Sequence, residues 1–196
     1  MNLPGHLAVG YLAAAWARGR LGTREGGPGE RRAFVQAPDW ARDVAPVLFG
    51  ALTPDLIDKS LLVAGVHRHG RTIGHSLLFV LAGAAVWLVL RWWTRRSGAP
   101  SSHRLVLGAH FWGMWVLGIA SHFVADLADD AVRGALTGGI MLSSWLFWPV
   151  ATPSTWDFRP PFAFWEGYGG PTPLEWIVIA SALGLIGWFH HRAQGS

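Results

Sequence analysis

Residues 105–126 read LVLGAHFWGMWVLGIASHFVAD, an almost uninterrupted apolar run that closes with a histidine and an aspartate. A helix that crosses a bilayer needs about 20 such residues at a rise of about 1.5 Å each. The run at 75–93, HSLLFVLAGAAVWLVLRWW, has the same character, and residues 3–18, 44–64 and 174–190 are further candidates. We therefore predict an all-α fold, a polytopic transmembrane helical bundle of about five crossing helices.

The composition is typical of a membrane protein, because hydrophobic residues make up 51% of the 196-residue chain and charged residues only 14%. The chain contains no cysteine, which excludes disulfides, thiolate ligands and a cysteine nucleophile. The net charge of +4 comes from arginines that cluster between the apolar segments, as the positive-inside bias produces. We therefore expect the lipid bilayer as a partner, and not nucleic acid.

The polar stretches between the apolar runs predict the topology. We expect one membrane-embedded domain, 1–196, with loops at 19–43 and 94–104 on one side and at 151–173 on the other. Eleven of the 16 Lys and Arg residues then fall on the side of the first two loops, which makes that side cytoplasmic. The chain is thus predicted to be a multi-pass protein of the inner (cytoplasmic) membrane with its N-terminus outside. The apolar piece at 140–150 is too short to cross and is expected to be re-entrant or interfacial.

Several ionisable residues lie in or at the ends of the predicted spans, where they are costly and by default mark function. Successive helices run in opposite directions, so the first and third begin at the same membrane face at which the second and fourth end. All of these residues therefore fall at that face, which the arginine count makes the outer one. The set is His6, Asp55, Asp58, His75, His122 and Asp126.

The local spacing of these residues favours a metal site. His122 and Asp126 are four residues apart and Asp55 and Asp58 three apart, so each pair shares one face of a helix. Pro54 is expected to break or bend its helix and so to aim the two carboxylates inward. Imidazole and carboxylate ligands suit Zn²⁺, our first choice, with Mn²⁺ or Fe²⁺ as alternatives and one or two ions per site.

Each residue also has a simpler interpretation. Asp55 could be an acidic first-turn residue of a new helix that begins after a proline. His6 could be an interfacial residue, and His122 with Asp126 a buried hydrogen-bonded pair that joins two helices. His67 and His69 are expected to be solvated loop residues.

Five segments carry a family resemblance. GHLAVGYL, GALTPDLIDK, GRTIGHSLL, GIASHFVADL and LFWPV resemble the YdjM-type family of LexA-regulated, membrane-bound metal-dependent hydrolases over nearly the whole chain. The resemblance implies metal-dependent hydrolysis without naming a substrate. This chain has GRTIGHS at 70–76 where the common family form has His-Arg-Gly-x-Thr-His-Ser. The positions that match the family's motifs are His6, Asp55, Asp58, His75, Ser76, Ser121, His122, Asp126, Trp148 and Pro149.

We hypothesise an enzyme that cleaves a phosphoester of a lipid or amphipathic substrate by metal-activated water. Asp58 is the candidate bridging ligand or general base, Arg71 the candidate phosphate clamp, and Lys59 lies near enough to help hold an anionic group.

Two alternatives stay open. One is a metal-dependent lipid amidase of the ceramidase kind, in which Ser76 or Ser121 would hold an oxyanion. The other is a non-enzymatic carrier or sensor of divalent metals. A carrier needs polar groups from face to face, whereas the cytoplasmic halves of the third and fourth helices carry only His110 as an ionisable group.

Overall fold

The computed structural model describes residues 3–22, 39–66, 71–96, 103–137, 144–150 and 173–194. Within these ranges every regular element is a helix, which confirms the all-α fold class, and a helix lies at each of the five predicted segments. The elements are α1 (Leu3–Gly22), the short π-helix η1 (Trp40–Val44), α2 (Ala45–Val63), α3 (Leu77–Arg96), α4 (His103–Thr137), the short 3-10 helix η2 (Ser144–Phe147) and α5 (Pro173–Gln194).

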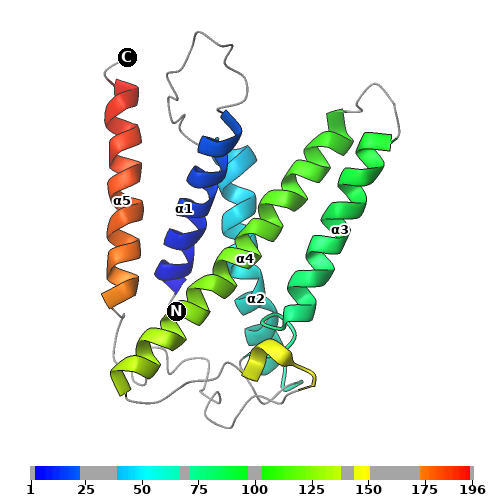
Figure 1. Cartoon of the computed structure of the whole chain (residues 1–196), viewed down its shortest axis with the longest axis vertical. Coiled ribbons are helices and arrows are strands. Elements are labelled where there is room, and N and C mark those ends of the chain that lie inside the picture. The colour runs from blue at the N-terminus through cyan, green and yellow to red at the C-terminus, as the bar shows by residue number, and fades with distance from the viewer. Residues whose placement is uncertain are drawn as a thin grey trace.

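The five long helices form one bundle in which successive helices run in opposite directions (Figure 1). The long helix α4 crosses the bundle diagonally and packs against α1, α2 and α3. Helix α5 lies at the edge of the bundle and packs mainly on α1. The beginnings of α1, α3 and α5 and the ends of α2 and α4 therefore lie toward the same end of the bundle, the lower end in Figure 1.

Local signals explain several of the helix starts. The Asp39 carboxylate accepts a hydrogen bond from the Arg42 amide at 2.7 Å and caps η1. Pro46 occupies the first turn of α2, where its missing N–H costs nothing. The Ser76 hydroxyl accepts from the Phe79 amide at 3.3 Å at the start of α3. These contacts explain where η1, α2 and α3 begin.

Among the described residues, three segments are long and apolar enough to cross a membrane: Leu77–Arg96, Gly108–Val132 and Pro173–His191. Helix α3 exposes a face of large apolar side chains, as a lipid-facing helix does, including Leu78, Leu81, Leu88, Val89, Trp92 and Trp93. Three of the five predicted crossing helices are thus candidate spans, and the predicted number of five crossings is not confirmed. Helix α2 falls short because three charged residues, at 55, 58 and 59, interrupt its apolar sequence.

The helix boundaries differ from the predictions in ways that affect the site. Helix α4 was expected to end at residue 125, but it continues to Thr137. Charged residues interrupt the apolar run after residue 125, yet residues 126–137 remain rich in helix-forming Ala and Leu. His75 was expected to be the first residue of the third helix and lies two residues before its start. Helix α2 runs unbroken through Pro54, so a break of the helix at Pro54 and a new helix that starts at Asp55 are both wrong.

The predicted loops are only partly covered by the structure. Residues 23–38, 97–102 and 151–172 of these loops lie outside the described residues. Of the predicted re-entrant or interfacial segment, residues 144–150 are described, as η2 and a following turn.

Helices α2 and α4 make backbone contact where two glycines meet. A Cβ atom on Gly118 would collide with the carbonyl oxygen of Val47, and one on Gly50 with that of Trp115. Such small residues let membrane helices approach closely. Fully buried Ala51 and Ile119 belong to the same layer, which lies between the end of the bundle at which α2 and α4 end and the opposite half.

A second buried polar group lies beyond this layer. The Asp43 carboxylate of η1 lies 3.0 Å from Nε2 of His110 on α4 and 3.8 Å from a guanidinium nitrogen of Arg18 on α1. It also accepts a hydrogen bond from the Asp39 amide at 3.2 Å. This arrangement ties three elements together in the half of the bundle away from His75.

Candidate metal centre

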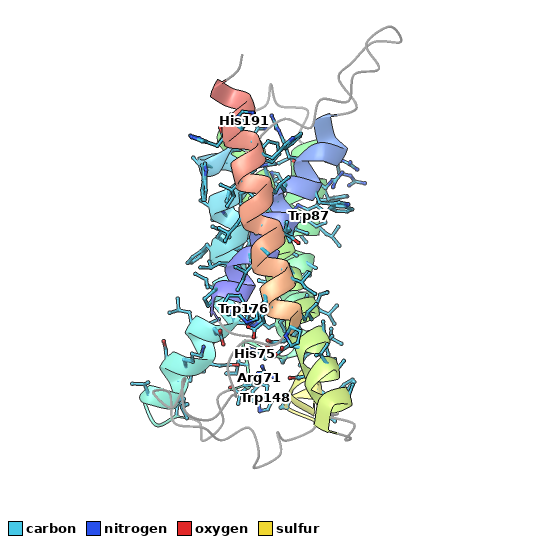
Figure 2. All side chains as sticks on the ribbon, turned by 90° about the vertical axis from the view of Figure 1, so that its left-hand side faces the viewer. Arg71, His75, Trp87, Trp148, Trp176 and His191 are labelled. Atoms are coloured by element: carbon cyan, nitrogen blue, oxygen red, sulfur yellow. The ribbon has the colours of Figure 1, made fainter. Side chains whose placement is uncertain are left out.

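The structure brings together, at one end of the bundle, residues that are far apart in the sequence. Figure 2 shows His75 and Arg71 toward this end, with Trp148 beyond them and His191 at the opposite end. His6 begins α1, Asp55 and Asp58 lie in the second half of α2, and His122 and Asp126 lie on α4. Of the six predicted ligands, all but Asp55 are fully buried, and the Asp55 side chain is 16% exposed.

Asp58 is surrounded by hydrogen-bond donors from the segment that precedes α3. One carboxylate oxygen accepts from the Gly74 amide at 2.8 Å and the Thr72 hydroxyl at 3.0 Å. The other accepts from the amides of Thr72 at 2.6 Å and His75 at 3.2 Å, and lies 2.7 Å from Nδ1 of the His75 ring. A carboxylate with this many donors is an acceptor only, so Nδ1 of His75 carries the proton.

Gly74 makes this cradle possible. Its amide reaches Asp58, and a Cβ atom at this position would collide with the carbonyl oxygen of Pro54. Only glycine lets the segment lie this close to α2 without displacing the helix backbone. The motif that contains His75 is thus fixed against α2 by one carboxylate and one glycine.

His122 is oriented in the same way from the other side. Its Nδ1 lies 2.7 Å from the carbonyl oxygen of Ala51, which can only accept, so this nitrogen also carries the proton. The Nε2 atoms of His122 and His75 then both present lone pairs, and they face each other at 3.0 Å. Two facing lone pairs repel unless a positive charge, a shared proton or a metal ion, lies between them.

Asp126 completes this arrangement. One of its carboxylate oxygens lies 3.5 Å from Nε2 of His75 and 3.5 Å from Nε2 of His122. Donor atoms about 2.0–2.1 Å from a tetrahedral zinc ion lie roughly 3.3 Å from one another. The three atoms, separated by 3.0 to 3.5 Å, therefore already approximate one face of a zinc coordination tetrahedron.

Two further ligand candidates flank these three atoms. The other Asp126 oxygen lies 3.3 Å from Nε2 of His6, whose ring stacks on His122 with centroids 3.8 Å apart. Nδ1 of His6 is buried without a hydrogen-bond partner among the described residues. On the opposite side, Asp55 lies 3.7 Å from Nε2 of His75. Ligand atoms of His6, His122 and Asp126, and separately of Asp55, His75 and His122, lie within 4.8 Å of one another, so these residues could hold a metal ion.

Arg71 and Lys59 lie at the rim of this cluster, and each is paired with a candidate ligand. Lys59 Nζ is 3.0 Å from an Asp55 oxygen, and one guanidinium nitrogen of Arg71 is 3.2 Å from an Asp126 oxygen. The other Arg71 nitrogen lies 3.3 Å from Asp130, a contact that the sequence analysis missed. The sequence contains a signal for this contact, because Asp130 follows Asp126 by four residues and so shares its helix face. The prediction missed it because the helix was expected to end before Asp130.

Other residues singled out from the sequence have different positions. His67 and His69 lie outside the described residues. The hydroxyl of Ser76 donates to the Ile73 carbonyl at 2.8 Å, and that of Ser121 to the Gly118 carbonyl at 2.7 Å. Both hydroxyl protons are therefore committed to the backbone.

The fold and the site together define an α-helical membrane protein with a buried His/Asp cluster that could hold a metal ion. Comparison with protein families is consistent with this class: the model of the YdjM inner membrane protein family matches residues 1–193. The chain belongs to this family, as the motifs in its sequence predict, and the family name indicates the inner membrane. Searches of curated proteins and of solved structures gave no significant match.

Proposed function

We propose that the protein is a metal-dependent hydrolase that cleaves a phosphoester of a lipid or amphipathic substrate. The observation that carries the proposal is the pair of Nε2 atoms of His75 and His122 at 3.0 Å, each with its Nδ1 proton committed elsewhere. Two histidines and one carboxylate with a further position left for water are a ligand set of catalytic zinc sites. A bound divalent ion supplies a water of lowered pKa and polarises a phosphoryl oxygen.

The donor set favours one ion over two. His122 belongs to both groups of convergent ligand atoms, and its Nδ1 is held by the Ala51 carbonyl, so only Nε2 remains to bind a metal. We therefore assign one ion to His75, His122 and Asp126, with Asp55 or His6 able to complete the coordination. Zn²⁺ fits these ligands best, and Mn²⁺ or Fe²⁺ also accept them.

The roles of Asp58 and Arg71 follow from their contacts. Both oxygens of Asp58 already accept hydrogen bonds, so we assign it to orient His75 rather than to bind the metal or act as general base. Asp55, the most exposed carboxylate of the predicted set, reaches the rim of the site and stays a candidate ligand. Arg71 is the candidate phosphate clamp.

The site geometry favours phosphoester hydrolysis over the two alternatives. An amidase of the proposed kind needs a serine hydroxyl for the oxyanion, yet Ser76 and Ser121 both donate to backbone carbonyls. A metal carrier needs polar groups from face to face, yet the layer around Gly50 and Gly118 is closely packed and apolar. We place the site at the outer face of the membrane because the predicted topology assigns eleven of the 16 Lys and Arg residues to the opposite side.

The test uses the full-length protein purified in detergent. We expect about one equivalent of zinc by elemental analysis, and release of phosphate from a lipid phosphoester that a chelator abolishes and zinc restores. Release of fatty acid without phosphate would favour the amidase. A metal-free wild type after reconstitution with each of the three ions would overturn the proposal.

A further inference from the structure

Among the described residues, Lys59 and Arg71 are the cationic side chains that contact candidate ligands of the cluster, and both are partly exposed to solvent. Their side chains are 35% and 17% exposed, whereas those of His75, His122 and Asp126 are 0 to 1% exposed. Each contacts one candidate ligand carboxylate: Lys59 contacts Asp55 at 3.0 Å and Arg71 contacts Asp126 at 3.2 Å.

Each of these two carboxylates, Asp55 and Asp126, can therefore pair with its cationic side chain or bind a metal ion. The Asp126 oxygen that faces Arg71 is the same one that lies 3.5 Å from Nε2 of His75 and of His122. A metal ion at those nitrogens would draw this oxygen toward itself and neutralise part of its charge. The metal and the cationic side chain thus compete for one carboxylate, and the same holds for Asp55 between a metal and Lys59.

Asp130 can hold Arg71 in place when a metal ion replaces Arg71 as the partner of Asp126. One guanidinium nitrogen lies 3.3 and 3.4 Å from the two oxygens of Asp130, while the other nitrogen faces Asp126. Once Asp126 is bound to metal, the second nitrogen can bind another anion while the first stays anchored. A fixed guanidinium is the preferred protein group for a phosphate oxyanion.

We propose that Lys59 and Arg71 form a binding site for the phosphate group of the substrate, and that this site becomes available only when a metal ion has bound to the cluster. The inference rests on the metal centre of the proposed function and adds an order of binding, metal before anion. Before metal binds, both cations neutralise the ligand carboxylates. After metal binds, they attract an incoming phosphate to the edge of the metal centre.

Arg71→Met should change the affinities for phosphate and for zinc in opposite directions. Arg71→Met removes a phosphate-binding group and also removes the competitor of the metal for Asp126. Affinity for inorganic phosphate should fall at least tenfold, and affinity for zinc should rise, by about two- to tenfold. Lys59→Met should behave in the same way through Asp55. A purely structural role of either side chain would weaken both affinities together.

The measurements are equilibrium dialysis of radiolabelled inorganic phosphate and zinc titration, on full-length protein in detergent. Wild type should bind phosphate at least tenfold more tightly with metal than without it. Arg91→Met is the matched control, because Arg91 is an exposed arginine on α3 that lies over the Trp87 ring, 5.3 Å from its centre, outside the cluster. It should change neither affinity.

Asp130→Asn provides a second variant that keeps Arg71. Without Asp130 the guanidinium should pair fully with Asp126, so zinc affinity should fall several-fold, the opposite of the effect of Arg71→Met. Equal phosphate affinity with and without metal, or weaker zinc binding in Arg71→Met, would overturn the inference. These measurements of phosphate and zinc binding do not depend on hydrolysis. If phosphate binding required metal as expected but no substrate were hydrolysed, only the proposed function would be contradicted.

Discussion

Nδ1 of His75 lies 2.7 Å from the Asp58 carboxylate, on the side of the ring opposite the nitrogen that faces His122. This contact fixes both the tautomer and the orientation of His75. It is the carboxylate–histidine pairing that commonly supports a metal-bound imidazole, and it raises the basicity of the nitrogen that would bind the metal. The buried aspartate on α2 therefore acts on the site through a histidine that belongs to another segment.

Replacing Asp58 with asparagine should weaken metal binding without removing a ligand. The amide cannot accept as many hydrogen bonds as the carboxylate, so the His75 ring and the segment around Thr72 lose their anchor. We expect zinc affinity to fall by about 10- to 100-fold, as for other partners of metal-bound histidines. Thr72→Val, which removes a single donor to Asp58, should cost much less. Unchanged zinc affinity in Asp58→Asn would contradict the positioning role.

Alanine at His122 or Asp126 should abolish both bound metal and hydrolysis. Each substitution removes one of the three closest ligand atoms, so the ion loses one corner of the tetrahedral face that these atoms form. His110→Ala is the matched control, because this histidine lies on the same helix but contacts Asp43 instead of the cluster. Elemental analysis and released phosphate should separate the variants. An Asp126→Ala variant with full metal content would remove this residue from the ligand set.

Much of the site could be predicted because apolar helices make polar residues conspicuous. His122 and Asp126 stand at the end of an apolar run, and alternating helix directions place Asp55 and His75 at the same level. The sequence could not show which atoms face one another. The five hydrogen bonds to Asp58 depend on the path of residues 72–75, which no periodicity specifies.

The continuation of α4 was missed for a different physical reason. Hydropathy indicates where a helix leaves the hydrocarbon core of the membrane, but it does not indicate where the helical backbone hydrogen bonds end. The last turns of α4 carry Asp130, which contacts Arg71, so the error in length also hid one contact of the site. The Asp43 and His110 contact was equally hidden, because the two residues are far apart in sequence.

Alanine at Gly118 should destabilise the bundle. Its Cβ would collide with the backbone of Val47 and Ala51, so α2 and α4 would have to move apart. We expect a loss of about 1–3 kcal/mol in the free energy of unfolding, typical of overpacking. Gly184→Ala is the control, since a Cβ at that position on α5 meets no atom within 4 Å. Thermal unfolding in detergent should show a lower midpoint for Gly118→Ala only; equal midpoints would contradict the close contact.

The contacts of Asp43 with His110 and Arg18 should stabilise the fold without affecting metal binding. Asp43→Asn keeps the shape of the side chain but removes the charge that faces His110 and Arg18. We expect a loss of about 1–3 kcal/mol, the usual cost of weakening a buried charged hydrogen bond, with zinc content unchanged. Asp39→Asn is the control, because asparagine caps a helix as well as aspartate does. Loss of zinc in Asp43→Asn would show that the two polar groups are coupled.

The placement of the site at the outer face can be tested directly because the chain contains no cysteine. Ser60, in the last turn of α2 next to Lys59, and His191, near the end of α5, are both exposed, and the two helix ends point in opposite directions. Ser60→Cys should react with a membrane-impermeant maleimide in intact cells, and His191→Cys only after permeabilisation. Both should react in detergent, which controls for thiol reactivity. The reverse pattern in cells would move the metal centre to the cytoplasmic face, because helix packing fixes Ser60 and the cluster at the same end of the bundle. A substrate would then have to come from the cytoplasm or the inner leaflet.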